Sequence, residues 1–417
     1  MSRTANLAID VWPKYDSLHS AYEYASLQIL SLTDLTFFDC LQAGIIRLEQ
    51  RDPLESKIVL QRKVQWSDGS ELEVGDFFKG FIASIKANPF LVKVFLTSLQ
   101  KISMDGNTLR FSFNEPCPLF RPILEIPNFS PLKLGANLGP YIRTYVDRHG
   151  QTFTRNHNCP IDVGDFEFIQ VSIVKSPDEN IKMFQEGSLD VTCDTAFPYH
   201  LKPSRNFKSE ESGLRAGIEV GHRLGGVKNR DLRTYFLQLC SQTVYPDLIN
   251  VINHNRIPQK TEHMNQPPRN WNKFIDETQK DPLVLKLHDF YPNNIVVNAI
   301  IQSLESHGIK AEARLENYFD QKTTSDVKFS ILRSWGAHPS FKTVQELLNP
   351  EVRSKANSWN SFSEIIKNPF SDIRDGLSSW ERRFSQRIDL FKIPSMYLTK
   401  FSRKDYLLNR VIRGSNP

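Results

Sequence analysis

Short apolar runs separated by polar turns dominate the first 115 residues of the chain. The runs at residues 7–9 and 44–48 have the length and composition of short strands. Residues 102–113 alternate apolar and polar side chains on both sides of Gly106-Asn107, which is typical of a β-hairpin. Residues 75–85 instead carry phenylalanine and isoleucine at helical spacing and predict a helix. This part of the chain is therefore expected to mix short strands with helices.

The clearest alternation of strands and helices lies in the second half of the chain. Residues 282–287 predict a strand, residues 294–306 a helix and residues 309–315 a second strand. Because a helix between two strands allows them to run parallel, this unit indicates an α/β fold with a right-handed crossover. Closer to the carboxyl end, residues 380–391 predict a helix and residues 396–398 a terminal strand.

Composition excludes several classes of protein. The 417 residues are 40% hydrophobic and 24% charged, with 19 glycines and 24 prolines, which leaves room for two or three domains with substantial cores. Collagen-like, low-complexity and disordered chains are excluded. The formal net charge of +5 is spread thinly, so no nucleic-acid partner is expected. No apolar run approaches the length of a membrane span.

The residues that carry chemistry show no catalytic or metal-binding motif. The chain contains none of the common signatures for nucleophilic serine, zinc, P-loop or dinucleotide sites. Its ten histidines fit no metal-ligand spacing, so neither a metal nor another cofactor is expected. Its five cysteines are far apart and are expected to be free, buried small side chains: Cys40, Cys117, Cys159, Cys193 and Cys240.

Several segments, in the same order along the chain, resemble one family of binding proteins. The segments are Trp66-Ser67-Asp68-Gly69 with Gly75-Asp76-Phe77, then Gly139-Pro140-Tyr141, Glu186-Gly187-Ser188-Leu189-Asp190-Val191, Leu232-Arg233, and the crossover from Gln302 to Ile309. They are similar to motifs of the family 5 extracellular solute-binding proteins of ABC transporters, which bind oligopeptides, dipeptides or nickel. Each motif alone is short, but their shared order covers most of the chain.

The resemblance implies a two-lobed periplasmic-binding-protein-like fold of type II. Two α/β lobes would be joined by a hinge and would close on a ligand in the cleft between them. Lobe 1 would take residues 1–217, lobe 2 residues 218–393, and residues 394–417 would return to lobe 1. The implied partners are a small-molecule or short-peptide ligand and the permease of an ABC transporter, and we expect a monomer.

Relatives in this family are exported and carry a signal peptide, whereas residues 1–10 lack the charged and apolar regions of one. As the sequence stands, we therefore expect a cytoplasmic protein; if an amino-terminal signal was removed, the protein would be periplasmic or extracellular. The chain is also shorter than typical relatives between Ile85 and Ile102 and between His200 and Leu214. A reduced extra subdomain and a smaller ligand are expected.

A further departure concerns how the ligand is held. Peptide-binding relatives place an aspartate shortly after a Gly-Trp pair, where it binds the amino group of the peptide. The corresponding residues 334–340 contain no acid. Because burying an ammonium group without a carboxylate costs several kcal/mol, an α-amine is not expected to bind there. His338 could instead hydrogen-bond an anionic or neutral ligand, or be an ordinary loop histidine.

The candidate ligand-binding residues follow from the resemblance and from side-chain chemistry. Arginines suit anionic groups because a guanidinium binds a carboxylate with two hydrogen bonds. Tyrosine and tryptophan can either contact a ligand or pack in a core, and both roles remain open here. The candidates are Tyr141, Arg143, Arg233, Arg333, Trp335 and His338.

Two functions are consistent with the sequence. The first is a solute-binding protein that encloses a small peptide-like or polar metabolite for transport or for cytosolic sensing. The alternative is a cytosolic enzyme of secondary or small-molecule metabolism built on the same fold. A binding protein returns its ligand unchanged, whereas an enzyme alters it.

Overall fold

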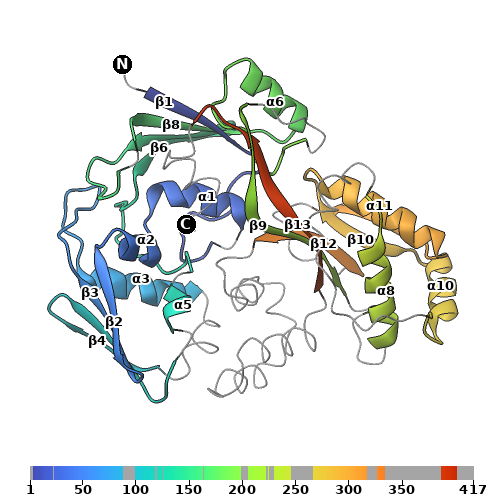
Figure 1. Cartoon of the computed structure of the whole chain (residues 1–417), viewed down its shortest axis with the longest axis horizontal. Coiled ribbons are helices and arrows are strands. Elements are labelled where there is room, and N and C mark those ends of the chain that lie inside the picture. Colours follow the sequence, from blue (N-terminus) through green and yellow to red (C-terminus); the bar gives the residue numbers. More distant parts are fainter. Residues whose placement is uncertain are drawn as a thin grey trace.

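The computed structural model describes most of the chain, and its elements form two groups (Figure 1). The described residues are 3–21, 23–87, 99–117, 120–124, 126–162, 164–198, 205–221, 224, 230–245, 266–316, 326–333 and 387–401. We call the group with the two sheets of the amino-terminal half lobe 1. We call the group around the sheet of the carboxyl-terminal half lobe 2.

The first sheet of lobe 1 has four strands in the order β1-β8-β7-β6. Strands β1 and β8 are parallel, and the other pairs are antiparallel. Its buried side chains form a core with those of helix α1, and the predicted strand at residues 7–9 is confirmed within β1. The elements are β1 (Arg3–Ile9), α1 (Tyr24–Thr33), β6 (Tyr141–Asp147), β7 (Gly150–Arg155) and β8 (Phe166–Ile173).

The second sheet of lobe 1 is antiparallel, in the order β2-β3-β5-β4. The predicted hairpin is confirmed by β4 and β5, with Gly106 at a positive φ in the turn. The predicted helix at residues 75–85 is confirmed within α3, which buries Phe77 and Phe81 against this sheet. The elements are α2 (Phe37–Gln42), β2 (Ile46–Asp52), β3 (Glu55–Leu60), α3 (Val74–Ala87), β4 (Leu99–Asp105), β5 (Thr108–Phe113) and α5 (Phe120–Leu124).

The motif segments 66–69 and 75–77 meet at the start of α3. The buried indole of Trp66 donates a hydrogen bond to Oδ2 of Asp76 over 3.1 Å, and the backbone N–H of Glu73 donates to the same oxygen. The turn between them is closed by Asp68, whose Oδ1 accepts from the backbone N–H of Ser70. This motif therefore has a structural role: it fixes the beginning of α3 to the turn before it.

Lobe 2 is built on a five-stranded mixed sheet in the order β11-β10-β12-β9-β13. Strand β10 is parallel to β11 and β12, and β9 is antiparallel to both β12 and β13. The predicted strand–helix–strand unit is confirmed as β10, α11 and β11. The elements are β9 (Phe207–Val220), α8 (Arg230–Gln242), α10 (Trp271–Lys280), β10 (Leu283–His288), α11 (Asn293–Ser306), β11 (Ala311–Glu316), β12 (Val327–Arg333) and β13 (Arg387–Leu398).

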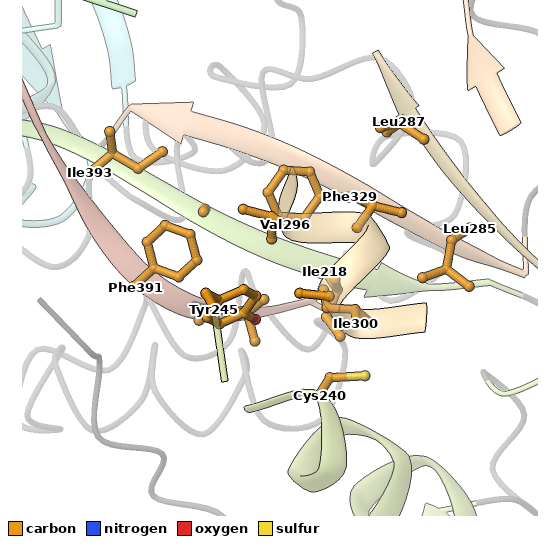
Figure 2. Close-up of a cluster of buried hydrophobic side chains, with 14 of the residues drawn as sticks. Ile218, Cys240, Tyr245, Leu285, Leu287, Val296, Ile300, Phe329, Phe391 and Ile393 are labelled. Atoms are coloured by element: carbon orange, nitrogen blue, oxygen red, sulfur yellow. The ribbon is translucent and has the colours of Figure 1, made fainter. Parts of the chain in front are cut away.

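One face of the lobe-2 sheet carries the apolar core. Figure 2 shows side chains of the strands, among them Leu285, Phe329 and Ile218, packed with Val296 and Ile300 of α11. Each fully buried side chain of this size contributes roughly 1.5–3 kcal/mol relative to an exposed one. Because successive side chains of a strand point to opposite faces, the residues between these apolar positions lie on the other face.

Two long strands run from lobe 1 to lobe 2 (Figure 1). Strands β9 and β13 pair along their length, from Glu219 with Arg387 to Phe207 with Leu398. Just after β13, Thr399 forms an antiparallel bridge with Val191, which also bridges β1 at Leu7. Backbone pairing therefore continues from the lobe-2 sheet into the first sheet of lobe 1.

The helix predicted at residues 380–391 is wrong at its carboxyl end, because β13 already begins at Arg387. The apolar residues Ile388 and Phe391 are three residues apart, which fits a helix, whereas Ile388 and Leu390 are two apart, which fits a strand. A register shift between Asp389 and Phe391 accounts for the interruption. The partner strand β9, which lies far away in the sequence, decides between the two structures.

Candidate functional site

A group of polar side chains gathers at the carboxyl end of the parallel strands β1 and β8. Asp10 follows β1, Lys175 lies shortly after β8, and Asp194 follows the bridge residue Val191. In open α/β sheets ligands bind in the crevice beyond the carboxyl ends of the strands. We therefore take this group as the candidate functional site of lobe 1.

Asp194 is the buried centre of the site, with 3% of its surface exposed. Its Oδ2 accepts a hydrogen bond of 2.6 Å from the hydroxyl of Tyr24 on α1 and one of 2.7 Å from the hydroxyl of Ser395 on β13. Hydrogen bonds to a carboxylate are stronger than neutral ones. Asp194 therefore fastens a strand that runs between the lobes to a helix of lobe 1.

Asp10 is the neighbouring acid, and its pKa is raised from 3.8 to about 6. Desolvation is the main cause, and the negative charge of Asp194 adds to it; a hydrogen bond from Thr195 and the charge of Lys175 act in the opposite direction. A carboxyl group with this pKa changes its charge close to neutral pH. Asp10 and Asp194, which are distant in the sequence, thus lie close together in one partly buried site.

Asn180 of α6 (Pro177–Gln185) holds the loop that carries Asp194. The side chain of Asn180 is fully buried and donates to the carbonyl oxygens of Cys193 and Ala196, at 2.9 and 2.8 Å. It also accepts from the backbone N–H of Cys193. Because all three bonds restrain the same turn, the loop is fixed independently of any ligand.

Cys193 lies within the site but is not placed for nucleophilic chemistry. Burial and the nearby charges of Asp10 and Asp194 raise the pKa of its thiol. Since the thiolate is the reactive form, a raised pKa makes the group inert. No disulfide joins any of the five cysteines, which all lie among the described residues; four of them are buried, and Cys159 is half-buried. No group of three or more metal-binding side chains occurs in the described part of the chain.

Tyr141 lies in the core of lobe 1 and is not exposed. It begins β6, and its hydroxyl donates to the backbone oxygen of Phe166 over 3.2 Å. Burial raises the pKa of its phenol above the ordinary value. Packing is therefore one role of Tyr141, and its contact with a ligand stays a prediction.

Three other sequence-derived candidates lie on other elements than the group around Asp194. Arg143 on β6 forms an ion pair with Asp16 over 3.4 Å. Arg233 is half-buried on α8, where desolvation and the charge of Arg230 lower its pKa. Arg333 ends β12, where its backbone pairs with Leu214. The remaining two, Trp335 and His338, lie outside the described residues.

Sequence reasoning missed the residues that form the site in lobe 1. Asp10 could have been noticed, because it directly follows the apolar strand predicted at residues 7–9 and acids are seldom buried. Asp194, Tyr24 and Ser395 carry no such signal, since they meet only through pairing between segments as distant as residues 24 and 395.

Removing the hydroxyl of Tyr24 tests whether the hydrogen bonds to Asp194 stabilise the protein. We expect Tyr24→Phe to lower the free energy of unfolding by about 1 to 2 kcal/mol, because the buried carboxylate of Asp194 then loses the hydrogen bond that Tyr24 donates. Urea unfolding followed by circular dichroism measures the change. Tyr235→Phe is the control, since this hydroxyl forms no hydrogen bond in the described part of the chain. Equal stability of the wild type and Tyr24→Phe would show that the bond contributes nothing.

Comparison with known proteins identifies solved structures with a similar fold. No family model matches the chain, and no curated protein matches its sequence. Solved structures do match: OppA of Listeria monocytogenes bound to peptide is 14% identical, with a TM-score of 0.71 over 96% of this chain and 95% of that one. The murein tripeptide binding protein MppA of Escherichia coli is 13% identical, with a TM-score of 0.72 over 99% and 97%.

A third similar structure is NikA of Staphylococcus aureus in complex with Ni(L-His)2, which is 10% identical with a TM-score of 0.69 over 96% and 95%. The likeness thus extends over nearly the whole of each chain. It confirms the fold class expected from the sequence motifs. The chain has the two-lobed α/β fold of the peptide- and nickel-binding proteins that serve ABC transporters.

Proposed function

We propose that the chain is a solute-binding protein that encloses a small peptide-like or other polar metabolite between its two lobes. The pair β9 and β13 supports this proposal most directly. These two strands run between the lobes and pair along their length, so the lobes are joined by a narrow, continuous ribbon. Such a ribbon is suited to hinge closure, in which a few residues absorb the change in backbone angles.

The site at the end of β1 supports the same function. Its loop is held by Asn180 and its carboxylate by Tyr24 and Ser395, so these polar groups of lobe 1 are fixed without a ligand. Preorganised polar groups reduce the ordering cost of binding. The boundaries at residues 217/218 and 393/394 remain part of the proposal, and they fall within β9 and β13.

The partner and the location follow from the same proposal. OppA and DppA structures that resemble this one are bound to peptides, and one similar protein, AgaA, is bound to agropinic acid. We propose an ABC transporter permease as the partner, a monomeric state, and a location outside the cytoplasmic membrane if a leader is removed. No helix in the described part of the chain is long and apolar enough to cross a membrane. Light scattering and fractionation of the native cells test these points.

Calorimetric titration distinguishes the binding function from the enzyme alternative. Titrating di- and tripeptides and free amino acids into the protein is expected to give saturable binding of one ligand per chain for part of the panel. Mass spectrometry of each ligand after long incubation is expected to return it unchanged. Conversion of a bound ligand would contradict the proposal and favour the enzyme. If no ligand of the panel binds, peptide-like solutes are excluded from the proposed function.

A further inference from the structure

Lys286 is a buried lysine near the end of β10. Its neighbours Leu285 and Leu287 belong to the apolar core, so Lys286 points to the opposite face of the lobe-2 sheet. Only 3% of its side chain is exposed. Lysine is almost never fully buried unless it is paired, so the groups around its ammonium decide what this residue does.

The ammonium of Lys286 faces a carboxylate that is divided between two lysines. Oε1 of Glu316, the last residue of β11, lies 3.7 Å from Nζ of Lys286, and Oε2 lies 3.6 Å from Nζ of Lys328. Lys286 and Lys328 are direct neighbours on β10 and β12. Both contacts are ion pairs, but both exceed the length of a hydrogen bond.

Glu316 does not use the hydrogen-bonding capacity of Lys286. An ammonium group has three N–H donors, and the 3.7 Å between Nζ of Lys286 and Oε1 of Glu316 is too long for a hydrogen bond. The two ammonium groups that share the carboxylate of Glu316 also repel each other. A second carboxylate placed beside Glu316 would accept from Lys286 and would offset this repulsion.

The position of the three residues suits a ligand. Strands β10, β11 and β12 are parallel; Glu316 ends β11, and Lys286 is two residues from the end of β10. The carboxyl ends of β10 and β11 thus meet at this cluster, and Lys328 joins it from the amino-terminal end of β12. Ligands of α/β sheets bind beyond the carboxyl ends of strands. The side chain of Lys328 keeps 14% of its surface exposed, so the cluster is reached from the surface on that side.

We infer that Lys286, Glu316 and Lys328 hold a carboxylate of the bound solute, placed beside Glu316 and between the two ammonium groups. This inference rests on the proposed function, because it names the chemical class of the solute. It agrees with the sequence, because residues 334–340 contain no acid that could bind the amino group of a peptide. Lobe 2 would then bind the solute by its carboxylate end. Lysine binds such a group as a point charge, with the ammonium turning to meet its oxygens.

Matched ligands that differ only in this group test the inference on the wild-type protein. Dipeptides and tripeptides, trialanine among them, are titrated beside their carboxyl-terminal amides, and the ratio of the two Kd values is measured. We expect the free acid to bind about 10- to 100-fold more tightly than the amide. In Lys286→Met the ratio is expected to fall close to one, and in Lys328→Met to an intermediate value. Lys63→Met, at a lysine whose side chain is 86% exposed, keeps the wild-type ratio.

The ratio separates a ligand-binding role from a structural one. If Lys286 only stabilises the sheet, Lys286→Met weakens the acid and the amide equally, and the inference is overturned while the proposed function stands. Equal binding of acid and amide by the wild type overturns it without any variant. Inorganic phosphate that competes as well as the peptide acids would make this a general anion site, against the assignment to a carboxylate. Absence of binding by every pair overturns the inference and removes peptide-like solutes from the proposed function.

Discussion

Replacing Gly80 by alanine is expected to destabilise the protein by about 3 kcal/mol. Gly80 lies in the middle of α3, where a Cβ atom would overlap the backbone carbonyl group of Ser130. The obstacle is backbone and not the flexible end of a side chain, so the helix and the segment at Ser130 would have to separate. That shift would disturb the core between α3 and Phe129. Urea unfolding measures the loss.

Gly75→Ala is the matched control on the same helix. A Cβ atom at Gly75 would meet nothing within 4 Å. Because alanine favours helix more than glycine does, this variant is expected to be unchanged or up to about 1 kcal/mol more stable. The contrast between the two variants isolates close packing from helix propensity. Similar stabilities for Gly80→Ala and Gly75→Ala would contradict the described contact between α3 and residue 130.

Replacing Asp10 by asparagine is expected to make the protein more stable above about pH 6, by about 1 to 3 kcal/mol at pH 8. The pKa of Asp10 is about 6 in the folded protein and 3.8 in the ordinary case, so the folded state holds the proton more tightly. The stability that this group contributes is fully present below about pH 4 and is lost as the pH rises through about 6. Asparagine is neutral throughout and gives up only the attraction of Lys175.

Urea unfolding of the wild type and Asp10→Asn between about pH 4 and pH 8 measures this difference. The two curves should converge toward the acid end and separate as the pH rises through about 6. Asp165→Asn is the control, because the side chain of Asp165 is 84% exposed, and its curve should follow the wild type. A gap between wild type and Asp10→Asn that does not depend on pH would show that Asp10 is not desolvated.

Local patterns predicted those elements whose structure depends on their own residues. The hairpin of β4 and β5 follows from Gly106-Asn107, and the unit of β10, α11 and β11 follows from its periodicity and from Gly308. Strand β13 was predicted too short because its amino-terminal half obtains its structure from β9. The pairing of Arg387 with Glu219 joins residues that no local pattern connects.

The candidate sites show the same limit more strongly. Residue type suggested Arg143 and Tyr141 as ligand contacts, which stay predictions; in the structure Arg143 forms an ion pair with Asp16 and Tyr141 lies in a core. The polar cluster of lobe 1 depends on Ser395 reaching Asp194, which requires the whole path of β13. Lys286 falls within the strand predicted at residues 282–287, and only β11 and β12 bring Glu316 and Lys328 beside it.

Native mass spectrometry of the protein, purified without refolding, shows whether the chain encloses a solute. We expect a mass that exceeds the mass of the chain by one small molecule, which is released on denaturation and identified as an intact carboxylate-bearing metabolite or short peptide. A protein that carries no ligand and instead transforms a component of a cell extract would contradict the solute-binding function and establish the enzyme alternative.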